Sequence, residues 1–202
     1  MKIILATRNK GKVKEFNVLA EGTNLEFIPL PEEIGNLPEE TGTTFQENAL
    51  IKAKFAFENC GGTPCLADDS GLEVNFLDGA PGIYSARYSE EGTDDSNTQK
   101  LLKNMHGVPK KDRKASFKCS LVLIGKDCDH SVEGSFEGEI GTILKGENGF
   151  GYDPIFVLPE SGLHLAELNQ IEKIKVSHRS IAFNKLKAVL EVSRYIFCIL
   201  DC

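Results

Sequence analysis

Residues 2–20 read KIILATRNKGKVKEFNVLA, and this stretch indicates the class of fold. The apolar run at 2–6 predicts a short strand, and the polar residues at 7–12 predict a loop. Val13, Phe16 and Leu19 then fall at the spacing of one helix face. A strand, a loop and a helix in succession are a building unit of α/β folds, so we expect the chain to adopt one.

Helix and strand patterns alternate through the first third of the chain, and pairs of strands follow. Thr44 and Glu47 form a T-x-x-E capping box that predicts the start of a long helix, and Gly61-Gly62 predicts its end. The other predicted elements are strands at 25–30, 64–67, 115–124, 131–140 and 154–158, a short helix that stops at Gly107, and a last helix that follows Ser177. This order predicts an α/β fold with a mixed central sheet and flanking helices.

The composition is that of a folded protein. The 202 residues are 41% hydrophobic and 26% charged, close to the averages for globular proteins, which excludes a disordered, collagen-like or low-complexity chain. The length predicts a single domain over residues 1–202, with room for two lobes. The apolar run at 195–200 is too short to cross a bilayer, and residues 1–6 are too few for a signal peptide. We expect a soluble, cytoplasmic protein with no membrane partner.

The net charge and the spacing of the cysteines restrict the classes of ligand and partner that we expect. The chain has 23 basic and 30 acidic residues, so its formal net charge is −7. An acidic chain repels a phosphate backbone, which argues against a nucleic acid polymer as partner, although a local cluster of cations can hold a small anion. The six cysteines form neither a C-x-x-C pair nor a zinc-finger pattern, so we expect reduced thiols. The basic residues at 110–114 are interpreted as a solvated loop.

Two segments carry groups suited to a phosphorylated ligand. The loop at 7–12 places two lysines and an arginine at the start of the first predicted helix, where backbone N–H groups can cradle phosphate. It is not a Walker A loop, because Ala6 and Val13 stand where that pattern needs Gly and Ser or Thr. Asp68 and Asp69 directly follow a predicted buried strand, where carboxylates point into the crevice of an α/β sheet and suit Mg²⁺. The simpler alternatives are a solvated turn at the first segment and an exposed acidic turn at the second.

Two later segments carry aromatic and basic groups. Gly149 and Gly151 flank Phe150, which allows the backbone to approach a ligand while the ring offers a stacking face for a purine. His178 and Arg179 begin the last predicted helix, where cations oppose the helix dipole unless a ligand compensates them. A flexible glycine turn and a structural histidine remain alternatives. Together, the four segments predict a nucleoside triphosphate site.

Six segments resemble the signature motifs of the inosine triphosphate pyrophosphatase family, in the family's order. They are TRNKGK at 7–12, ETG at 40–42, ADDSGL at 67–72, PGIYSARY at 81–88, GFGYDPIF at 149–156 and SHR at 177–179. The resemblance covers nearly the whole chain. It departs at Arg8, where bacterial relatives often carry glycine.

The resemblance implies an enzyme that hydrolyses ITP, dITP and XTP to the nucleoside monophosphate and pyrophosphate, and so removes non-standard purines from the nucleotide pool. It also implies two lobes around a nucleotide cleft, a homodimer and Mg²⁺ as cofactor. The implied metal ligands are Glu40, in preference to its neighbour Glu39, and Asp69, which is also the implied catalytic proton acceptor. The implied substrate-binding residues are Thr7, Arg8, Asn9, Lys10, Gly11, Lys12, Ser70, Phe150, Gly151, Tyr152, Asp153, Lys173, His178 and Arg179.

Two other functions are compatible with the same residues. One is a Mg²⁺-dependent pyrophosphatase for another modified nucleotide, and the other is a nucleotide-binding module without catalysis. For the purine substrates, discrimination is expected at the 6-position of the base. A 6-oxo group accepts hydrogen bonds from Arg179 or His178, whereas the 6-amino group of adenine leaves such a donor unpaired.

Overall fold

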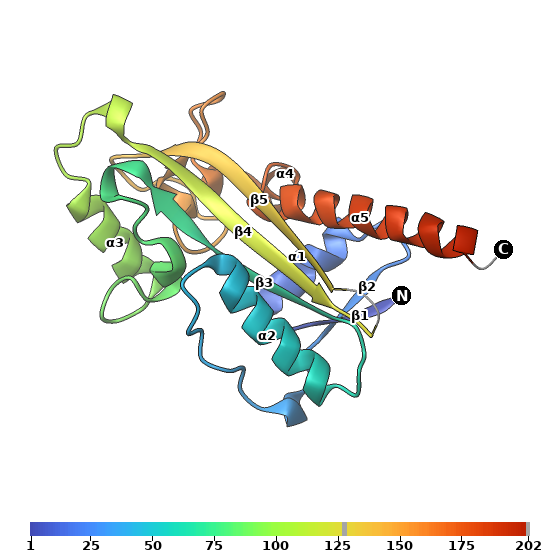
Figure 1. The fold of residues 1–202 in the computed structure, drawn as a ribbon. Coiled ribbons are helices and arrows are strands. Elements are labelled where there is room, and N and C mark those ends of the chain that lie inside the picture. Colours follow the sequence, from blue (N-terminus) through green and yellow to red (C-terminus); the bar gives the residue numbers. More distant parts are fainter. Residues whose placement is uncertain (127–128, 201–202) are drawn as a thin grey trace. The chain divides into compact units, whose positions relative to one another are not determined.

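A mixed six-stranded sheet organises the chain. The structure is a computed structural model that describes residues 1–126 and 129–200, and its strand order is β2-β1-β3-β4-β5-β6 (Figure 1). β1 pairs in parallel with β2 and β3, and β5 pairs antiparallel with β6, which confirms the predicted α/β class with a mixed sheet. The strands are β1 (Lys2–Leu5), β2 (Glu26–Pro29), β3 (Cys65–Val74), β4 (Lys114–Ile124), β5 (Asp129–Ile140) and β6 (Phe156–Val157).

The helices begin and end at the signals that the sequence carries. The Oγ1 atom of Thr44 accepts the N–H of Glu47 at 3.1 Å, and the chain leaves the second helix through Gly61 and Gly62, both at positive φ. The helices are α1 (Lys10–Leu19), α2 (Phe45–Asn59), α3 (Asp94–Asn104), α4 (Gln170–Lys175) and α5 (His178–Leu200). Helix α4 was not predicted, although Asn169 and Glu172 form a capping box at its start.

The chain divides into two compact units, and each unit has its own core. Unit 1 comprises Met1–Asp69, Cys119–Gly134 and the chain from Arg179 onward, and unit 2 comprises Ser70–Lys118 and Ser135–His178. Strands β3, β4 and β5 each contribute residues to both units.

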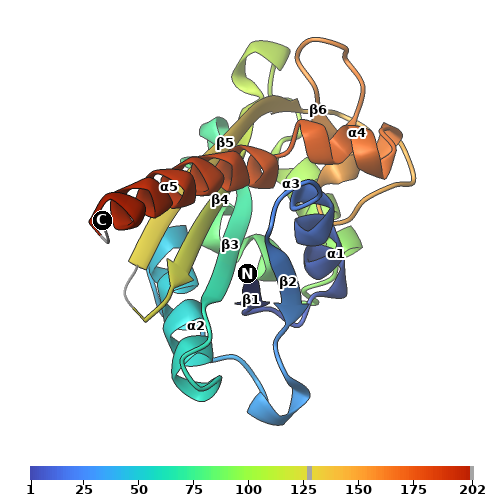
Figure 2. The same cartoon turned by 90° about the vertical axis from the view of Figure 1, so that its right-hand side faces the viewer.

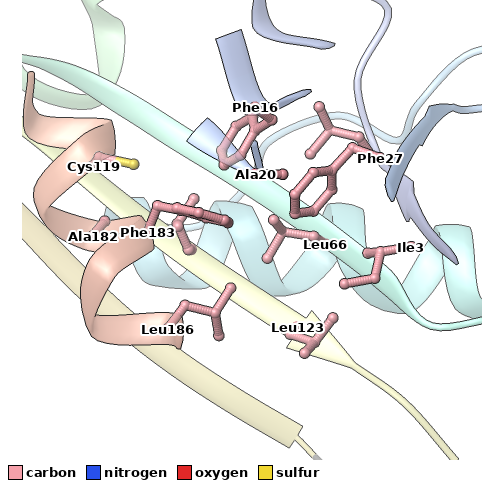
Figure 3. Close-up of a cluster of buried hydrophobic side chains, with 12 residues drawn as sticks. Ile3, Phe16, Ala20, Phe27, Leu66, Cys119, Leu123, Ala182, Phe183 and Leu186 are labelled. Carbon is pink, nitrogen blue, oxygen red and sulfur yellow. The ribbon is translucent and has the colours of Figure 1, made fainter. Parts of the chain in front are cut away.

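In unit 1, helices α1 and α5 cover one face of the sheet. Phe16 of α1, Phe27 of β2 and Phe183 of α5 form an aromatic cluster whose ring centroids are 5.4 to 6.2 Å apart. This cluster packs on Leu66 and Leu123 of the sheet (Figure 3). The spacing and the tilted rings are those of favourable aromatic contacts, so this face is the main apolar support of unit 1.

Helix α2 covers the opposite face of the sheet in unit 1 (Figure 2). It contacts the strands through Ala49, Ala53 and Ala56, which are fully buried with Ile4 and Ala67. Because these side chains are small, the helix backbone lies close to the strands, and longer polar residues on the same helix reach the sheet directly.

The core of unit 2 is a separate cluster between α3 and the unit 2 parts of β3, β4 and β5. Leu101 of α3 and Met105, the residue that follows the helix, are fully buried with Leu72 and Phe156. The rings of Phe117 and Phe156 lie 4.6 Å apart. Tyr152 belongs to the same cluster and is only 5% exposed.

Strand β3 is longer than the sequence predicts. The predicted strand at 64–67 continues to Val74, so Asp68 and Asp69 lie inside it and do not form a turn beyond its end. The prediction was wrong because buried carboxylates interrupt an apolar pattern. Inside the strand, basic side chains that are distant in sequence neutralise both carboxylates.

The strand predicted at 154–158 is shorter than expected. Pro154 and Ile155 belong to a 3-10 turn, Asp153–Ile155, and only Phe156–Val157 pair with β5. Proline has no backbone N–H to donate to a strand ladder, which favours the turn.

Arg113 contradicts the prediction of a solvated loop at 110–114. Its side chain is buried, and its guanidinium donates to the carbonyls of Ile140 at 2.5 Å, Gly141 at 2.6 Å and Met105 at 2.8 Å. Arg113 thus joins the end of β5 to the end of α3 within unit 2. A basic run in a sequence does not reveal which of its members finds buried acceptors.

The cysteines of the described residues are consistent with the prediction of reduced thiols. Cys60, Cys65 and Cys119 are free. Cys128 and Cys202 lie outside the described residues, as does the side chain of Cys198. None of the helices in residues 1–126 and 129–200 combines the length and apolar character needed to cross a membrane.

We expect Arg113→Ala to lower the free energy of unfolding by about 3 kcal/mol, because several buried carbonyl groups lose their donor. Lys111→Ala, in the same basic run but exposed, should change it by less than about 0.5 kcal/mol. Urea unfolding followed by circular dichroism measures both variants. Equal losses would show that Arg113 contributes only as one charge of the run.

Candidate functional site

Asp68 and Asp69 point to opposite faces of the sheet. Successive side chains of a strand alternate between its faces, and the neighbours of the two residues follow this rule. Asp68 contacts Lys12 of α1 and Arg179 of α5, whereas Asp69 contacts Lys52 of α2. The two carboxylates therefore do not act as a pair at one metal ion, and each has its own environment.

Asp68 is the centre of a buried ion cluster in unit 1. Its Oδ2 accepts from Nε of Arg179 at 2.8 Å, and Lys12 binds Oδ1. Arg179 is 3% exposed and also donates to Glu15 at 3.1 Å. Burial alone raises the pKa of a carboxyl group, but Arg179 and Lys12 outweigh it and hold the pKa of Asp68 well below its usual range. Asp68 is therefore a permanent anion that anchors two cations.

Asp69 shares one ammonium group with Glu40. Nζ of Lys52 lies 2.8 Å from Oδ1 of Asp69 and 2.7 Å from Oε1 of Glu40, and it also donates to the carbonyl of Asp68 at 3.0 Å. Burial, with Glu40 and Asp68 nearby, raises the pKa of Asp69 to about 6 despite the opposing effect of Lys52. Two carboxylates around a single ammonium leave a local excess of negative charge.

The segment that carries Glu40 is fixed against α2. The backbone N–H of Gly42 donates to Oδ1 of Asn48 at 2.9 Å, and a Cβ at Gly42 would lie only 2.6 Å from Cβ of Glu47. Only glycine allows this close approach, so the ETG motif at 40–42 has a steric reason for its glycine. Asn48 in turn lies 3.4 Å from Oδ2 of Asp69, so one helix positions both acidic residues.

The loop at 7–12 has its polar groups engaged in two different ways. Asn9 caps α1, and its Oδ1 accepts the N–H groups of Gly11 at 2.8 Å and Lys12 at 3.2 Å. Arg8 donates to the carbonyls of Leu30 at 2.8 Å and Gly35, away from the ion cluster. These contacts hold the loop at the start of α1 in a fixed conformation.

A cavity of about 670 Å³ lies beside this loop in unit 1. Cationic side chains, those of Arg8, Lys10 and Lys14, line it together with Thr7 and the single acidic residue Glu32. Lys10 is exposed, and no ion pair involves its ammonium within the described residues. The loop is therefore fixed in conformation, and its surroundings carry excess positive charge.

In unit 2, the glycine-rich loop at 149–153 is held by its own aspartate. Oδ2 of Asp153 accepts the N–H of Phe150 at 2.9 Å and pairs with Lys173 of α4. Gly149 has φ +84°, and a Cβ there would lie 2.1 Å from Oδ2 of Asp153. The close approach and the positive φ both require glycine at this position.

The two aromatic residues of this loop have different environments. Phe150 is 43% exposed, and the ammonium of Lys173 lies 4.4 Å from its ring centroid, a cation–π contact. Tyr152 is buried, and its hydroxyl donates to the carbonyl of Ser85 at 2.8 Å, so it supports the loop from within the core. Of the two rings of this loop, that of Phe150 alone offers exposed aromatic surface.

The remaining predicted residues occupy both units. Ser70 follows Asp69 directly on β3, and His178 begins α5 with its ring stacked on Phe117 at a centroid distance of 5.0 Å. His178 lies in unit 2 and Arg179 in unit 1. Unit 1 thus collects the predicted phosphate-binding and metal-binding residues together with Arg179, and unit 2 collects Ser70, Phe150, Gly151, Tyr152, Asp153, Lys173 and His178.

Lys52, Asn48 and Glu15 are not among the residues that the sequence predicts for the site. A signal for the first two was available: Asn48 and Lys52 are four residues apart and adjoin the alanine stripe of α2, so both polar side chains face the sheet. A lysine in a buried stripe indicates a nearby carboxylate. Nothing comparable marks Glu15, whose partner Arg179 is 164 residues away.

The donor set at Glu40 and Asp69 fits a magnesium ion. Both carboxylates already contact one shared cation, the Lys52 ammonium, and Mg²⁺ in nucleotide enzymes commonly takes one or two carboxylates together with substrate phosphates. Within residues 1–126 and 129–200, no group of three or more histidine, cysteine or acidic side chains is placed to hold a metal. Any metal here therefore needs further ligands from water or substrate.

Comparisons with known proteins agree with the arrangement of these motifs. The model of the Ham1 family matches residues 3–189. A dITP/XTP pyrophosphatase of Photobacterium profundum is 47% identical over 194 residues, which cover 94% of this chain and 98% of the relative. One of Vibrio parahaemolyticus is 49% identical over 193 residues, which cover 94% and 96%.

The fold gives the same result. The solved structure of a HAM1 protein from Coxiella burnetii has a TM-score of 0.85 and 41% identity, and the match covers 95% of this chain and 98% of that one. The resemblance drawn from the six motifs is confirmed, and this chain belongs to the Ham1 family.

Proposed function

We propose that this protein hydrolyses the non-standard purine nucleotides dITP, XTP and ITP to the nucleoside monophosphate and pyrophosphate. The observation that carries the proposal is the charge distribution in unit 1. Glu40 and Asp69 share one ammonium and retain an excess of negative charge, while the loop at 7–12 lies beside excess positive charge. This combination suits a triphosphate bound with a divalent cation, and the names of the bacterial relatives support the choice of substrate.

The loop at 7–12 is proposed to bind the triphosphate. Lys12 is well suited to this role because its partner, Asp68, also pairs with Arg179. A phosphate can therefore bind the Lys12 ammonium while the buried carboxylate of Asp68 remains paired with Arg179. Arg8, which donates to Leu30 and Gly35, is proposed to brace the loop, and Thr7, Asn9, Lys10 and Gly11 complete the phosphate contacts.

Asp69 is proposed as the proton acceptor for the attacking water. A general base works best when its pKa lies near the working pH, and burial raises the pKa of Asp69 towards this range. Lys52 fixes the orientation of the carboxylate through Oδ1. Glu40 and Asp69 would hold Mg²⁺, which would supply positive charge against the phosphates when bound. Phosphoryl transfer also requires the attacking water and the leaving group to lie in line. The enzyme meets this requirement by positioning the bound substrate, as in other phosphoryl transfers.

The purine base is proposed to meet the loop at 149–153. Phe150 supplies the exposed ring, and Gly151, Tyr152 and Asp153 fix the loop backbone around it. Ser70, Lys173, His178 and Arg179 complete the proposed contacts, as the motifs imply. The buried ion pairs of Arg179 hold its guanidinium in one orientation, which suits a donor that recognises a 6-oxo group and leaves the amino group of adenine unmatched.

The same resemblance leads us to propose a homodimer and a cytoplasmic location. Free thiols at Cys60, Cys65 and Cys119 support a reducing compartment. The oligomeric state is measured directly by light scattering coupled to size-exclusion chromatography.

A panel of nucleoside triphosphates tests the proposed function. We expect turnover of ITP, dITP and XTP with release of pyrophosphate, much slower turnover of ATP, GTP and the pyrimidine triphosphates, and no turnover in excess EDTA. Pyrophosphate and orthophosphate are assayed separately. Preference for a pyrimidine or methylated nucleotide would show that the protein is a pyrophosphatase for another nucleotide. If no triphosphate is turned over with Mg²⁺, the protein is a nucleotide-binding module without catalysis.

Glu40→Gln and Glu39→Gln form a matched pair that tests the metal site. Glu40 contacts Lys52 at 2.7 Å, whereas the side chain of Glu39 is exposed. We expect Glu40→Gln to raise the Mg²⁺ concentration for half-maximal activity by about tenfold or more, as for loss of one ligand carboxylate, and Glu39→Gln to leave it unchanged. Magnesium titration of initial rates measures the effect, and equal shifts would refute Glu40 as a ligand.

Asp69→Asn and Asp68→Asn separate catalysis from stability. Asp69→Asn should reduce kcat by about 100-fold or more while the protein stays folded, because the proposed base and one ligand charge are lost. Asp68→Asn should lower the free energy of unfolding by about 3 kcal/mol, because Arg179 remains buried with only the carboxylate of Glu15 as counter-charge. Steady-state kinetics and urea unfolding give both quantities. A loss of only a few-fold in kcat for Asp69→Asn would exclude it as the base.

A further inference from the structure

The backbone of Gly151 is held from both sides by helix α3. Its N–H donates to Oδ2 of Asp94 at 2.8 Å, and its carbonyl accepts from Oγ1 of Thr98 at 3.3 Å. Asp94 and Thr98 are four residues apart and so lie on one face of the helix, one turn from each other. Gly151 itself has φ +60°, and no atom within 4 Å of its Cβ position confines it. Hydrogen bonds from α3, and not side-chain packing, therefore restrain the backbone at Gly151.

Helix α3 is a rigid platform for this contact. Leu101 and the C-cap residue Met105 are buried in the core of unit 2, and Thr93 with Ser96 closes the N-terminus of the helix in a capping box. Asn97, between Asp94 and Thr98, accepts the N–H of Ser89 at 2.7 Å and donates to the carbonyl of Ala86 at 3.2 Å. A displacement of the helix would break all of these contacts at once.

The same loop is tied to β3 by a second chain of hydrogen bonds. The hydroxyl of Tyr152 donates to the carbonyl of Ser85 at 2.8 Å, and the Ser85 hydroxyl accepts the N–H of Leu72 at 2.8 Å. Leu72 is two residues beyond Ser70 on β3. Gly151 and Tyr152 are thus anchored by elements that precede them by more than 50 residues.

We propose that Asp94 and Thr98 are positioning residues that set the base selectivity of the enzyme. This inference rests on the proposed function, in which the loop at 149–153 meets the purine. Neither side chain needs to touch the nucleotide. They fix the peptide groups of Gly151, and a recognition loop discriminates between bases only if its donors and acceptors stay in place when the wrong base is bound.

The alternative explanation of Asp94 is that it only stabilises the helix. Asp94 and Asp95 both lie in the first turn of α3, where negative charge is favourable to the helix dipole. The side chain of Asp95 is exposed and makes no hydrogen bond or ion pair with any described residue. Asp95→Ala therefore removes the same helix-terminal charge as Asp94→Ala but leaves Gly151 in place, which makes it the matched control.

The decisive measurement is the ratio of kcat/KM for ITP to that for ATP. We expect Asp94→Ala to reduce this ratio about fivefold, the effect of one hydrogen bond, and Asp95→Ala to leave it unchanged. The inhibition constant of tripolyphosphate, which has phosphates and no base, should stay within twofold of wild type in both variants. Asp94→Asn, which keeps an acceptor oxygen, should recover part of the ratio.

Thr98→Val tests the other half of the contact without a change in charge. It removes the hydroxyl that reaches the Gly151 carbonyl and conserves volume at a buried position. We expect a smaller loss of the ratio than in Asp94→Ala, because a neutral and longer hydrogen bond is lost. The double variant should lose more than either single variant.

Hydrogen exchange separates the loop restraint from the proposed function. Peptides that cover residues 149–152 should exchange faster in Asp94→Ala than in Asp95→Ala, whichever nucleotide the enzyme prefers. Faster exchange with an unchanged ITP to ATP ratio would overturn the selectivity role, and so would equal losses of the ratio and of tripolyphosphate binding. Absence of ITP turnover in the wild-type enzyme would refute the proposed function itself, and unchanged exchange would refute the restraint.

Discussion

The neutralisation of two consecutive buried carboxylates on β3 is the constraint on which unit 1 depends. An ionised carboxylate cannot be buried without a cation, and alternation along a strand sends Asp68 and Asp69 to opposite faces. Each face must therefore supply its own positive charge. Lys12 and Arg179 do so on the side of α1 and α5, and Lys52 does so on the side of α2. The placement of three helices is thus linked to two adjacent residues.

The carboxylates on the two faces of the sheet differ in the number of cations that pair with them. This difference gives Asp68 a structural role and makes Asp69 a candidate for a chemical one. Asp68 has two cations and a pKa well below its usual range, so it behaves as a fixed anion. Asp69 and Glu40 have one ammonium between them, and the pKa of Asp69 is raised. A group that is fully neutralised serves the fold, whereas a group short of a counter-charge is available for a metal or a proton. The same residue type performs both tasks because only its surroundings differ.

Unit 2 restrains its glycine-rich loop chiefly through hydrogen bonds, which involve the carboxylates of Asp94 and Asp153 and the hydroxyls of Thr98 and Tyr152. Glycine at 149 and 151 permits the positive φ angles and the close approach of Asp153, but it also removes the side chains that would hold the loop. Hydrogen bonds from Asp94, Thr98, Tyr152 and Asp153 replace that packing. A loop that needs glycine for its shape therefore needs partners from elsewhere for its stability.

The sequence by itself determined the fold class, several of the helices and the family, because these depend on local periodicity, on turn residues and on motifs that are contiguous in the sequence. It also marked most of the candidate residues, including the loop at 7–12 and Asp69. It did not show that β3 continues through Asp68 and Asp69, that Arg113 is buried, or that Lys52 lies between Glu40 and Asp69. Those features depend on contacts between residues that are separated along the chain, such as Lys52 with Glu40, 12 residues apart, and Arg179 with Asp68, 111 residues apart. Only the tertiary structure decided them, because the free energy of a buried charge depends on which distant group the fold places beside it.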